Sequence, residues 1–176
     1  MELNQADQYY LKALDYYPFN FEFVLENLQY ALSYDDKHVQ SLCLKGQIFM
    51  YYIKEFEEAK LCFIKALERN MLYPDVYKHL SKLYIWLGAY DEAKRLIRYG
   101  KKVPGINHYE LIRNEALLHE CQGDYQLAKS KLRQASLLTH SSDCRERSKE
   151  DMARLKEKLK ILKRSKKKGK KFAKTQ

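Results

Sequence analysis

Long apolar stretches are missing from this sequence. The longest strictly apolar run is IFMYYI at 48–53, far short of the ~20 residues that a membrane-spanning helix needs. The first residues, MELNQADQ, also lack the basic and then apolar segments of a secretory signal peptide. We therefore expect a protein without a transmembrane segment that stays in the cytoplasm.

Paired cysteine motifs are missing too. Cys43, Cys62, Cys121 and Cys144 are widely spaced, whereas zinc sites and disulfide frameworks use characteristic spacings. The thiols are therefore expected to be reduced, and no metal site is predicted. The cysteines at 43, 62 and 121 fall in expected helices, where cysteine commonly serves as a small packing residue.

Recognisable catalytic motifs are absent as well. None of the five histidines has a cysteine or serine beside it in a nucleophile motif, and no glycine-rich phosphate loop or zinc-protease histidine pair occurs. His119, Glu120 and Cys121 are adjacent, but consecutive helix residues point in different directions and cannot share a metal. We predict that the protein is not an enzyme and needs no cofactor.

What the sequence does contain is a repeat. WLGAYDEAKRLI at 86–97 has the same shape as QGDYQLAKSKLR at 122–133. Tyr90 aligns with Tyr125 at a step of 35 residues and with Phe56 at a step of 34, and an alanine follows each of them three residues later. A period of about 34 residues is that of a helix-turn-helix unit, the tetratricopeptide repeat.

The residue types also resemble those of the tetratricopeptide repeat family. Its pattern asks for a bulky residue, leucine, a small residue and an aromatic, then a glycine turn, and then tyrosine, alanine, an aromatic and alanine. The third unit has Tyr77, Leu80, Ser81, Tyr84, Gly88, Tyr90, Ala93, Ile97 and Gly100 at these positions. The fourth has Ile112, Ala116, Gly123, Tyr125, Ala128, Leu132 and Ala135, with His119 where an aromatic is expected.

The first two units depart from the pattern. The second unit matches it at Leu42, Gly46, Phe49, Phe56, Ala59, Phe63 and Ala66. Its first helix or turn is one residue longer, and Lys54 stands near the position of the turn glycine. The first unit matches at Leu28 and Ala31, with Val24 in the small-residue position and Pro18 at the join. The resemblance implies an all-α fold, a right-handed α-solenoid of helix-turn-helix repeats.

The residues favour this architecture without the family. Small side chains recur where antiparallel helices would cross, and strand signals are essentially absent. Gly88 and Gly123 can adopt the positive φ that ends a helix. Asn107 and Asp143 each stand three residues before a glutamate, which is N-cap spacing. Each helix pair leaves one apolar face open, so stacked neighbours must cover it.

The excess positive charge lies at the C-terminal end. Residues 145–176 hold 15 Lys and Arg and 4 Asp and Glu, a net charge of +11, and the rest of the chain has a net charge of −1. Apolar residues at 152, 155, 159 and 162 predict a helix that caps the solenoid. The predicted domain is therefore 1–163, with units at about 5–38, 39–73, 74–108 and 109–142, a capping helix at 143–163, and a disordered basic tail at 164–176.

The resemblance also implies a binding groove. In this family the first helices of successive pairs line a concave groove that holds a peptide. Counted from the small residue of each unit, the groove residues are Tyr9, Ala13, Tyr16, Cys43, Gln47, Met50, Lys78, Lys82, Ile85, Arg113, Asn114 and Glu120. Such a surface suits a partner peptide or helix with apolar anchors and an acidic end.

Some family members grip acidic C-termini with a clamp of cations and asparagines. If the 35-residue step continues past the fourth unit, Lys78, Asn114, Arg145 and Lys149 stand at the matching positions. Lys82 stands where asparagine is usual. These side chains would hold a terminal carboxylate well.

Two function classes follow, and a third idea stands beside them. The first is a scaffold that binds a partner protein in the groove. The second is a polyanion-associated protein that acts on RNA, a ribosome or an anionic surface through Lys166, Lys167, Lys168, Lys170 and Lys171. The third is self-association through the first units, because the chain's 15 tyrosines exceed what the core positions require.

Overall fold

The computed structural model describes residues 4–172, with side chains as far as Arg164. This part of the chain contains helices and no strand. The helices are α1 (Gln5–Tyr16), α2 (Phe21–Tyr34), α3 (Val39–Ile48), the π-helix η1 (Phe49–Ile53), α4 (Phe56–Arg69), α5 (Pro74–Trp86), α6 (Tyr90–Gly100), α7 (His108–Cys121), α8 (Tyr125–Leu137) and α9 (Ser142–Phe172). The all-α prediction is confirmed.

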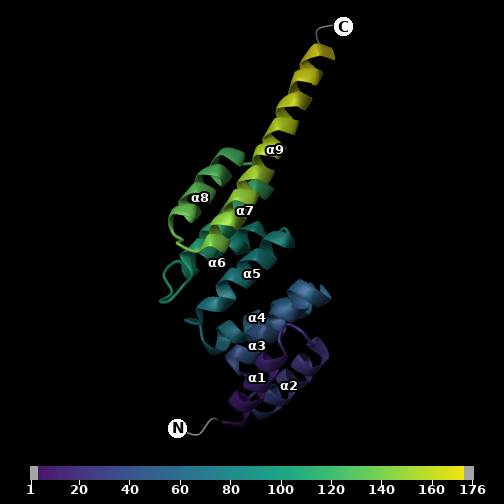
Figure 1. Cartoon of the computed structure of the whole chain (residues 1–176), viewed down its shortest axis with the longest axis vertical. Helices are drawn as coiled ribbons and strands as arrows, with labels where there is room; N and C mark the ends of the chain where they lie inside the picture. Colours follow the sequence, from purple (N-terminus) through teal and green to yellow (C-terminus); the bar gives the residue numbers. More distant parts are fainter. Residues whose placement is uncertain (1–3, 173–176) are drawn as a thin grey trace.

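The helices form a stack of antiparallel pairs rather than a bundle around one centre. Figure 1 shows the chain running from α1 and α2 at one end to α8 and α9 at the other. Buried residues form successive clusters along the stack, because each pair covers its apolar face with the next pair. Ala59, Ala93 and Ala128 are fully buried where helices cross. The fold is therefore a helical solenoid, as predicted.

Three equivalent turns join the helices of the second, third and fourth pairs. Gly88 and Gly123 take positive φ values of 74° and 84°. Ala89 and Asp124 then donate their backbone N–H groups to carbonyls five residues back, which closes each helix. In the second pair Lys54 takes the same conformation, with φ 70°. The extra residue that the sequence shows there is accommodated by η1.

One of the two predicted helix starts is displaced. Asn107 caps α7 as expected, because its side chain accepts a hydrogen bond from the N–H of Glu110. Asp143, in contrast, lies in the first turn of α9. The Ser141 carbonyl accepts the first helical hydrogen bond, and its hydroxyl lies 3.5 Å from the N–H of Cys144. A serine hydroxyl thus caps the helix in place of the aspartate.

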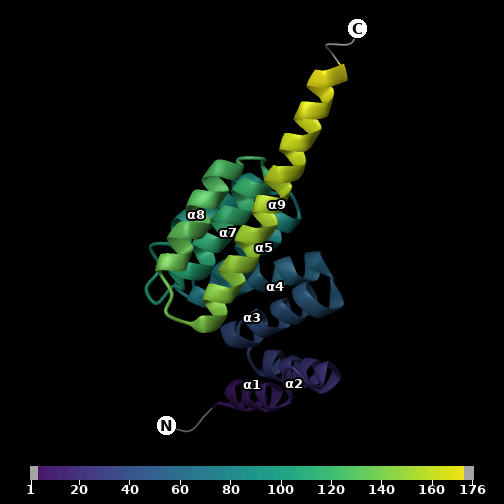
Figure 2. The same ribbon diagram turned by 45° about the horizontal axis from the view of Figure 1, so that its top comes forward.

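α9 is longer than its sequence predicted. Leu155 is fully buried on the fourth pair, with Met152 beside it. Beyond the body the helix continues outward (Figures 1 and 2), so the disorder expected from residue 164 is wrong as far as Phe172. Lysine is a good helix former and no proline follows, so a helix that is already nucleated can continue. Residues 173–176 of the predicted tail lie outside the described part.

The cysteines divide by burial. Cys43 and Cys62 are buried packing residues, as expected, and burial raises the pKa of the Cys43 thiol to about 12. Cys121 is exposed, so the packing role expected for it is wrong. All four thiols are free.

In the described part of the chain, no helix has the length and apolar character that crossing a membrane requires.

Candidate binding surface on the first-helix face

The first helices of the pairs contact one another along one side of the stack. Tyr51 of η1 reaches His79 of α5, Asn114 of α7 reaches the backbone of α5, and Arg113 of α7 reaches Asp151 of α9. We call this side the first-helix face. Its aromatic part is Tyr51, Lys82 and Trp86, and its ionic part is Glu110, Arg113, Glu120, Arg147, Asp151, Arg154 and Lys158.

Lys82 is the centre of the aromatic part. Its ammonium lies 5.3 Å from the ring centroid of Tyr51 and 5.1 Å from that of Trp86, distances at which a cation is attracted to an aromatic face. Burial lowers the pKa of Lys82 and the nearby Arg113 lowers it further, while the more distant carboxylates of Glu110 and Asp151 offset this only in part. Among the described side chains, no carboxylate lies within ion-pair distance of this ammonium.

His79 contacts Tyr51 and fixes the position of its ring. Burial lowers the pKa of His79 to about 3, so its ring is neutral at physiological pH. The Tyr51 hydroxyl lies 3.0 Å from His79 Nδ1, within hydrogen-bond distance, and burial also raises the pKa of the phenol. The His79 ring stacks on Phe63, with centroids 5.9 Å apart and planes 9° apart. Tyr51 is thus fixed beside Lys82 by a packed and hydrogen-bonded ring.

The ionic part joins α7 to α9. Arg113 donates to Asp151 at 2.5 Å and Arg147 donates to Glu110 at 2.8 Å. Glu120, almost fully buried, accepts from Arg154 at 2.9 Å and from Lys158 at 2.7 Å. Burial alone would raise the pKa of Glu120, but these two hydrogen bonds outweigh it and lower the pKa. The cations here are therefore already engaged.

Sequence reasoning missed the α9 side of this network. Its members recur at 147, 151, 154 and 158, which is the spacing of one helix face. Oppositely charged residues at 110, 113 and 120 of α7 have a compatible spacing. The signal was present, but the assumed 35-residue step selected different residues of α9.

Several predicted groove residues pack against other side chains. Tyr9 stacks on Tyr34 at 5.6 Å and Tyr16 lies 4.9 Å from Phe23, so both contact α2, and their binding role stays a prediction. Met50 is fully buried in the core and cannot contact a peptide. The prediction for Met50 was wrong because a helix in a solenoid has buried sides as well as an exposed one, and spacing alone does not separate them.

The four clamp residues are not brought together. The amide of Asn114 is buried and donates to the Lys78 carbonyl at 2.7 Å and to the Ser81 hydroxyl at 2.9 Å, so it bridges α5 and α7. Arg145 and Lys149 line a groove between α8 and α9 instead. Asn114 is therefore a structural residue, and the clamp that the sequence predicted is not assembled.

Of the other predicted groove residues, three remain accessible in part on the first helices. Gln47 is half-buried and lies 3.5 Å from the Cys43 sulfur. Lys78 pairs with Asp75 one turn before it. Arg113 is half-buried and engaged with Asp151. The five predicted polyanion-binding lysines belong to the last turns of α9, and their side chains lie outside the described residues.

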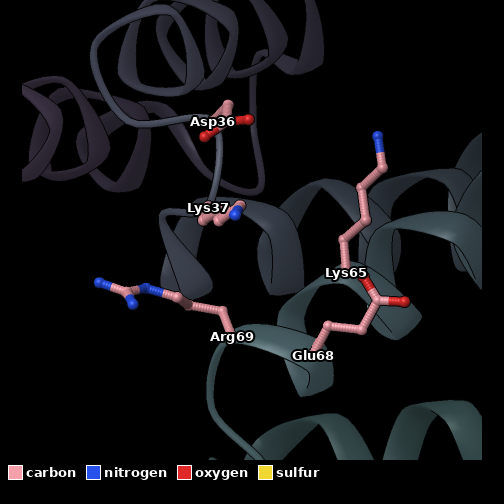
Figure 3. A pocket seen from close by; sticks show the side chains of 5 residues that line it. All are labelled: Asp36, Lys37, Lys65, Glu68 and Arg69. Carbon is pink, nitrogen blue, oxygen red and sulfur yellow. The ribbon is translucent and has the colours of Figure 1, made fainter.

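A charged pocket elsewhere does not form a site. It has a volume of about 330 Å³ and is lined by Asp36, Lys37, Lys65, Glu68 and Arg69. Figure 3 shows the Lys65 and Arg69 side chains pointing in different directions. Cations that do not converge, with carboxylates between them, offer little to a small anion.

The comparisons with known proteins address the fold. No protein-family model matches the chain, and no curated protein matches it. Among solved structures it is similar to the crystal structure of PilW, a widely conserved type IV pilus biogenesis factor, with a TM-score of 0.77. The sequence identity is 18%, and the match covers 88% of this chain and 70% of that one. This similarity supports a tetratricopeptide-like helical-repeat fold.

Proposed function

We propose that this protein is a non-enzymatic interaction scaffold whose first-helix face binds an acidic peptide or helix of a partner protein. The observation that carries the proposal is Lys82. It is a half-buried cation on two aromatic rings without a carboxylate partner among the described side chains, whereas the neighbouring cations of α7 and α9 are paired. A carboxylate of the partner completes this site.

The surroundings of Lys82 define what it binds. A carboxylate that approaches its ammonium forms a charge-assisted hydrogen bond in a partly desolvated setting, where such bonds are strong. Trp86 is 42% exposed and Tyr51 is rigidly held, so an apolar side chain next to the carboxylate can pack on their rings. The face therefore selects an acidic residue beside an apolar one.

Trp86 makes a direct test feasible, since it is the chain's single tryptophan. Short peptides ending in apolar and acidic residues, with a free or an amidated C-terminus, are titrated while tryptophan emission is followed. We expect a saturable change in the emission. Lys82→Met should raise the Kd about tenfold, because one charge-assisted hydrogen bond is lost. A difference between free and amidated peptides identifies a terminal carboxylate as the ligand.

The matched control is Lys94→Met, which removes an exposed cation from α6. It should leave the Kd unchanged. Equal weakening by both variants would point to general charge attraction and would rule out the Lys82 site. The site is also ruled out if tryptophan emission responds to none of the peptides.

A second candidate function is polyanion binding by the projecting part of α9. Lys160, Lys163 and Arg164 are exposed, and none has a carboxylate partner among the described side chains. This contrasts with the cations nearer the start of α9, which pair with α7. A row of uncompensated cations on a projecting helix (Figure 2) suits RNA or an anionic surface.

This alternative is tested with a short fluorescent RNA and anisotropy over a range of salt. Replacing Lys160, Lys163 and Arg164 with glutamine should weaken binding by about tenfold or more at low salt, because each cation lost reduces counterion release. A control with Lys94, Lys102 and Arg133 changed to glutamine removes the same charge from other exposed positions. Equal losses in both would mean diffuse attraction.

The cytoplasmic location stays a prediction.

A further inference from the structure

The N-terminal end of the stack presents a band of aromatic rings. Tyr16, Phe23, Tyr30 and Tyr34 are between 43% and 60% exposed. Tyr9 stacks on Tyr34 and lies 5.2 Å from Tyr30, and Tyr16 lies 4.9 Å from Phe23, so the rings run across α1 and α2 as one surface. We call these five residues the aromatic end.

The aromatic end lies outside the core that joins the first pair to the second. That core consists of Ala13, Val24, Leu28, Leu44 and Ile48, with other rings packed against it. Inside the stack, each pair has one such face toward the pair before it and one toward the pair after it. The aromatic end is the face of the first pair that no described residue covers.

The other end of the stack has a groove of matching character. It lies between α8 and α9, has a volume of about 590 Å³, and is mostly apolar. Met152 and Ala153 contribute apolar surface, and Arg145, Lys149 and Lys156 line it as cations. No acidic residue is among the described residues that line it. Arg145 donates to the His140 carbonyl, and Lys149 makes an exposed pair with Glu146, which holds it weakly.

The two ends are also opposite in charge. Helices α1 and α2 carry Asp15, Glu22 and Glu26, besides Asp7, which contacts His38. Their one lysine, Lys12, lies 4.7 Å from the Tyr9 ring centroid. Glu26 lies at the edge of the rings, since it accepts a hydrogen bond from the Tyr30 hydroxyl at 3.4 Å. Electron-rich rings with carboxylates beside them attract cations set around an apolar floor. The two ends of one chain thus complement each other.

We propose that the protein associates head to tail, with the aromatic end of one copy seated in the α8–α9 groove of the next. Helices α1 and α2 lie toward one end of the stack and α8 and α9 toward the other (Figure 1), so the aromatic end cannot reach the groove of its own chain. The contact joins two different surfaces and leaves one of each free, so association continues into open chains. The stacking that builds the solenoid within a chain then extends between chains.

The experiment follows the mass of the full chain by analytical ultracentrifugation over a range of concentrations. One variant, Phe23→Lys with Tyr30→Lys, disables the aromatic end. A second, Lys149→Glu with Lys156→Glu, disables the groove. The control, Lys160→Glu with Lys163→Glu, makes the same charge change at exposed positions of α9 that do not line the groove. Circular dichroism checks that each variant is folded.

We expect the unchanged chain and the control to associate in steps of one chain mass. Each end variant alone should stay monomeric up to a concentration at least about tenfold higher than the one at which the unchanged chain associates. An equimolar mixture of the two should form a dimer and nothing larger, because each supplies the end that the other lacks. The proposal is overturned if the unchanged chain stays monomeric, if a folded end variant still associates alone, or if the folded pair fails to form the dimer.

Discussion

The second and third units make the same turn with different residues. In the third, Gly88 takes the positive φ and the helix before it is regular. In the second, Lys54 takes it after a π-helical turn, and the N–H of Glu55 reaches back six residues to the Phe49 carbonyl rather than five. A wider turn thus absorbs one residue without disturbing the stack.

The irregular turn also builds the candidate site. Tyr51 lies in the middle of η1, where it contacts His79, Lys82 and Trp86 of the third unit. π-Helical turns are often found at functional sites because they turn a side chain away from the regular register. The departure from the repeat therefore coincides with the surface that we propose binds a partner.

The largest expected effect concerns the contact between the second and third units, where His79 meets Tyr51, at acidic pH. The pKa of His79 is lowered by burial from 6.5 to about 3. Its folded form therefore binds fewer protons than the unfolded chain, and stability falls as the pH drops below 6.5. Between pH 7 and pH 4.5 the free energy of unfolding should fall by about 2–3 kcal/mol from this group.

Urea unfolding at several pH values measures this effect. His79→Gln should remove most of this His79 contribution, because the group that takes up the proton is gone. His140→Gln, which replaces a histidine far from that contact, should keep it. The same pH profile for His79→Gln as for the unchanged chain would contradict the assignment.

The next effect concerns the helix crossing in the second unit. A Cβ on Gly46 would lie 2.7 Å from the Phe63 ring, whereas the third unit has Ser81 at the equivalent position. Gly46→Ala should lower the free energy of unfolding by about 1–3 kcal/mol through overpacking. Adding Phe63→Leu should recover part of the loss relative to Phe63→Leu alone. Additive effects of the two changes would show that the ring is not the obstacle.

The smallest effects come from the turns themselves. Gly88→Ala should cost about 1 kcal/mol, since a Cβ is strained at positive φ. Lys54→Gly relieves that strain in the second unit and should raise the free energy of unfolding by about 0.5 kcal/mol. Both are measured by urea unfolding at neutral pH. A loss of stability in Lys54→Gly would mean that its side chain has a further role.

Much of the fold could be predicted because it depends on local and periodic features. The turn at Gly88, the cap at Asn107 and the buried alanines follow from short-range spacing. The candidate site could be predicted only in part. Lys82 and Arg113 were identified, but Tyr51, Trp86 and Asp151 were not, because they come from separate helices whose facing sides depend on how the pairs stack.

The sequence by itself determined the helical class, the period, the turn positions and the concentration of positive charge in α9. These follow from residue size, conformational freedom and charge, which act within one or two turns of chain. Only the tertiary structure decided that Asn114 bridges two helices, that the cations of α9 divide into paired and unpaired groups, and that Lys82 lies over two rings. Those outcomes depend on which helix sides face each other, and a wider turn or a changed step of one or two residues is enough to alter them.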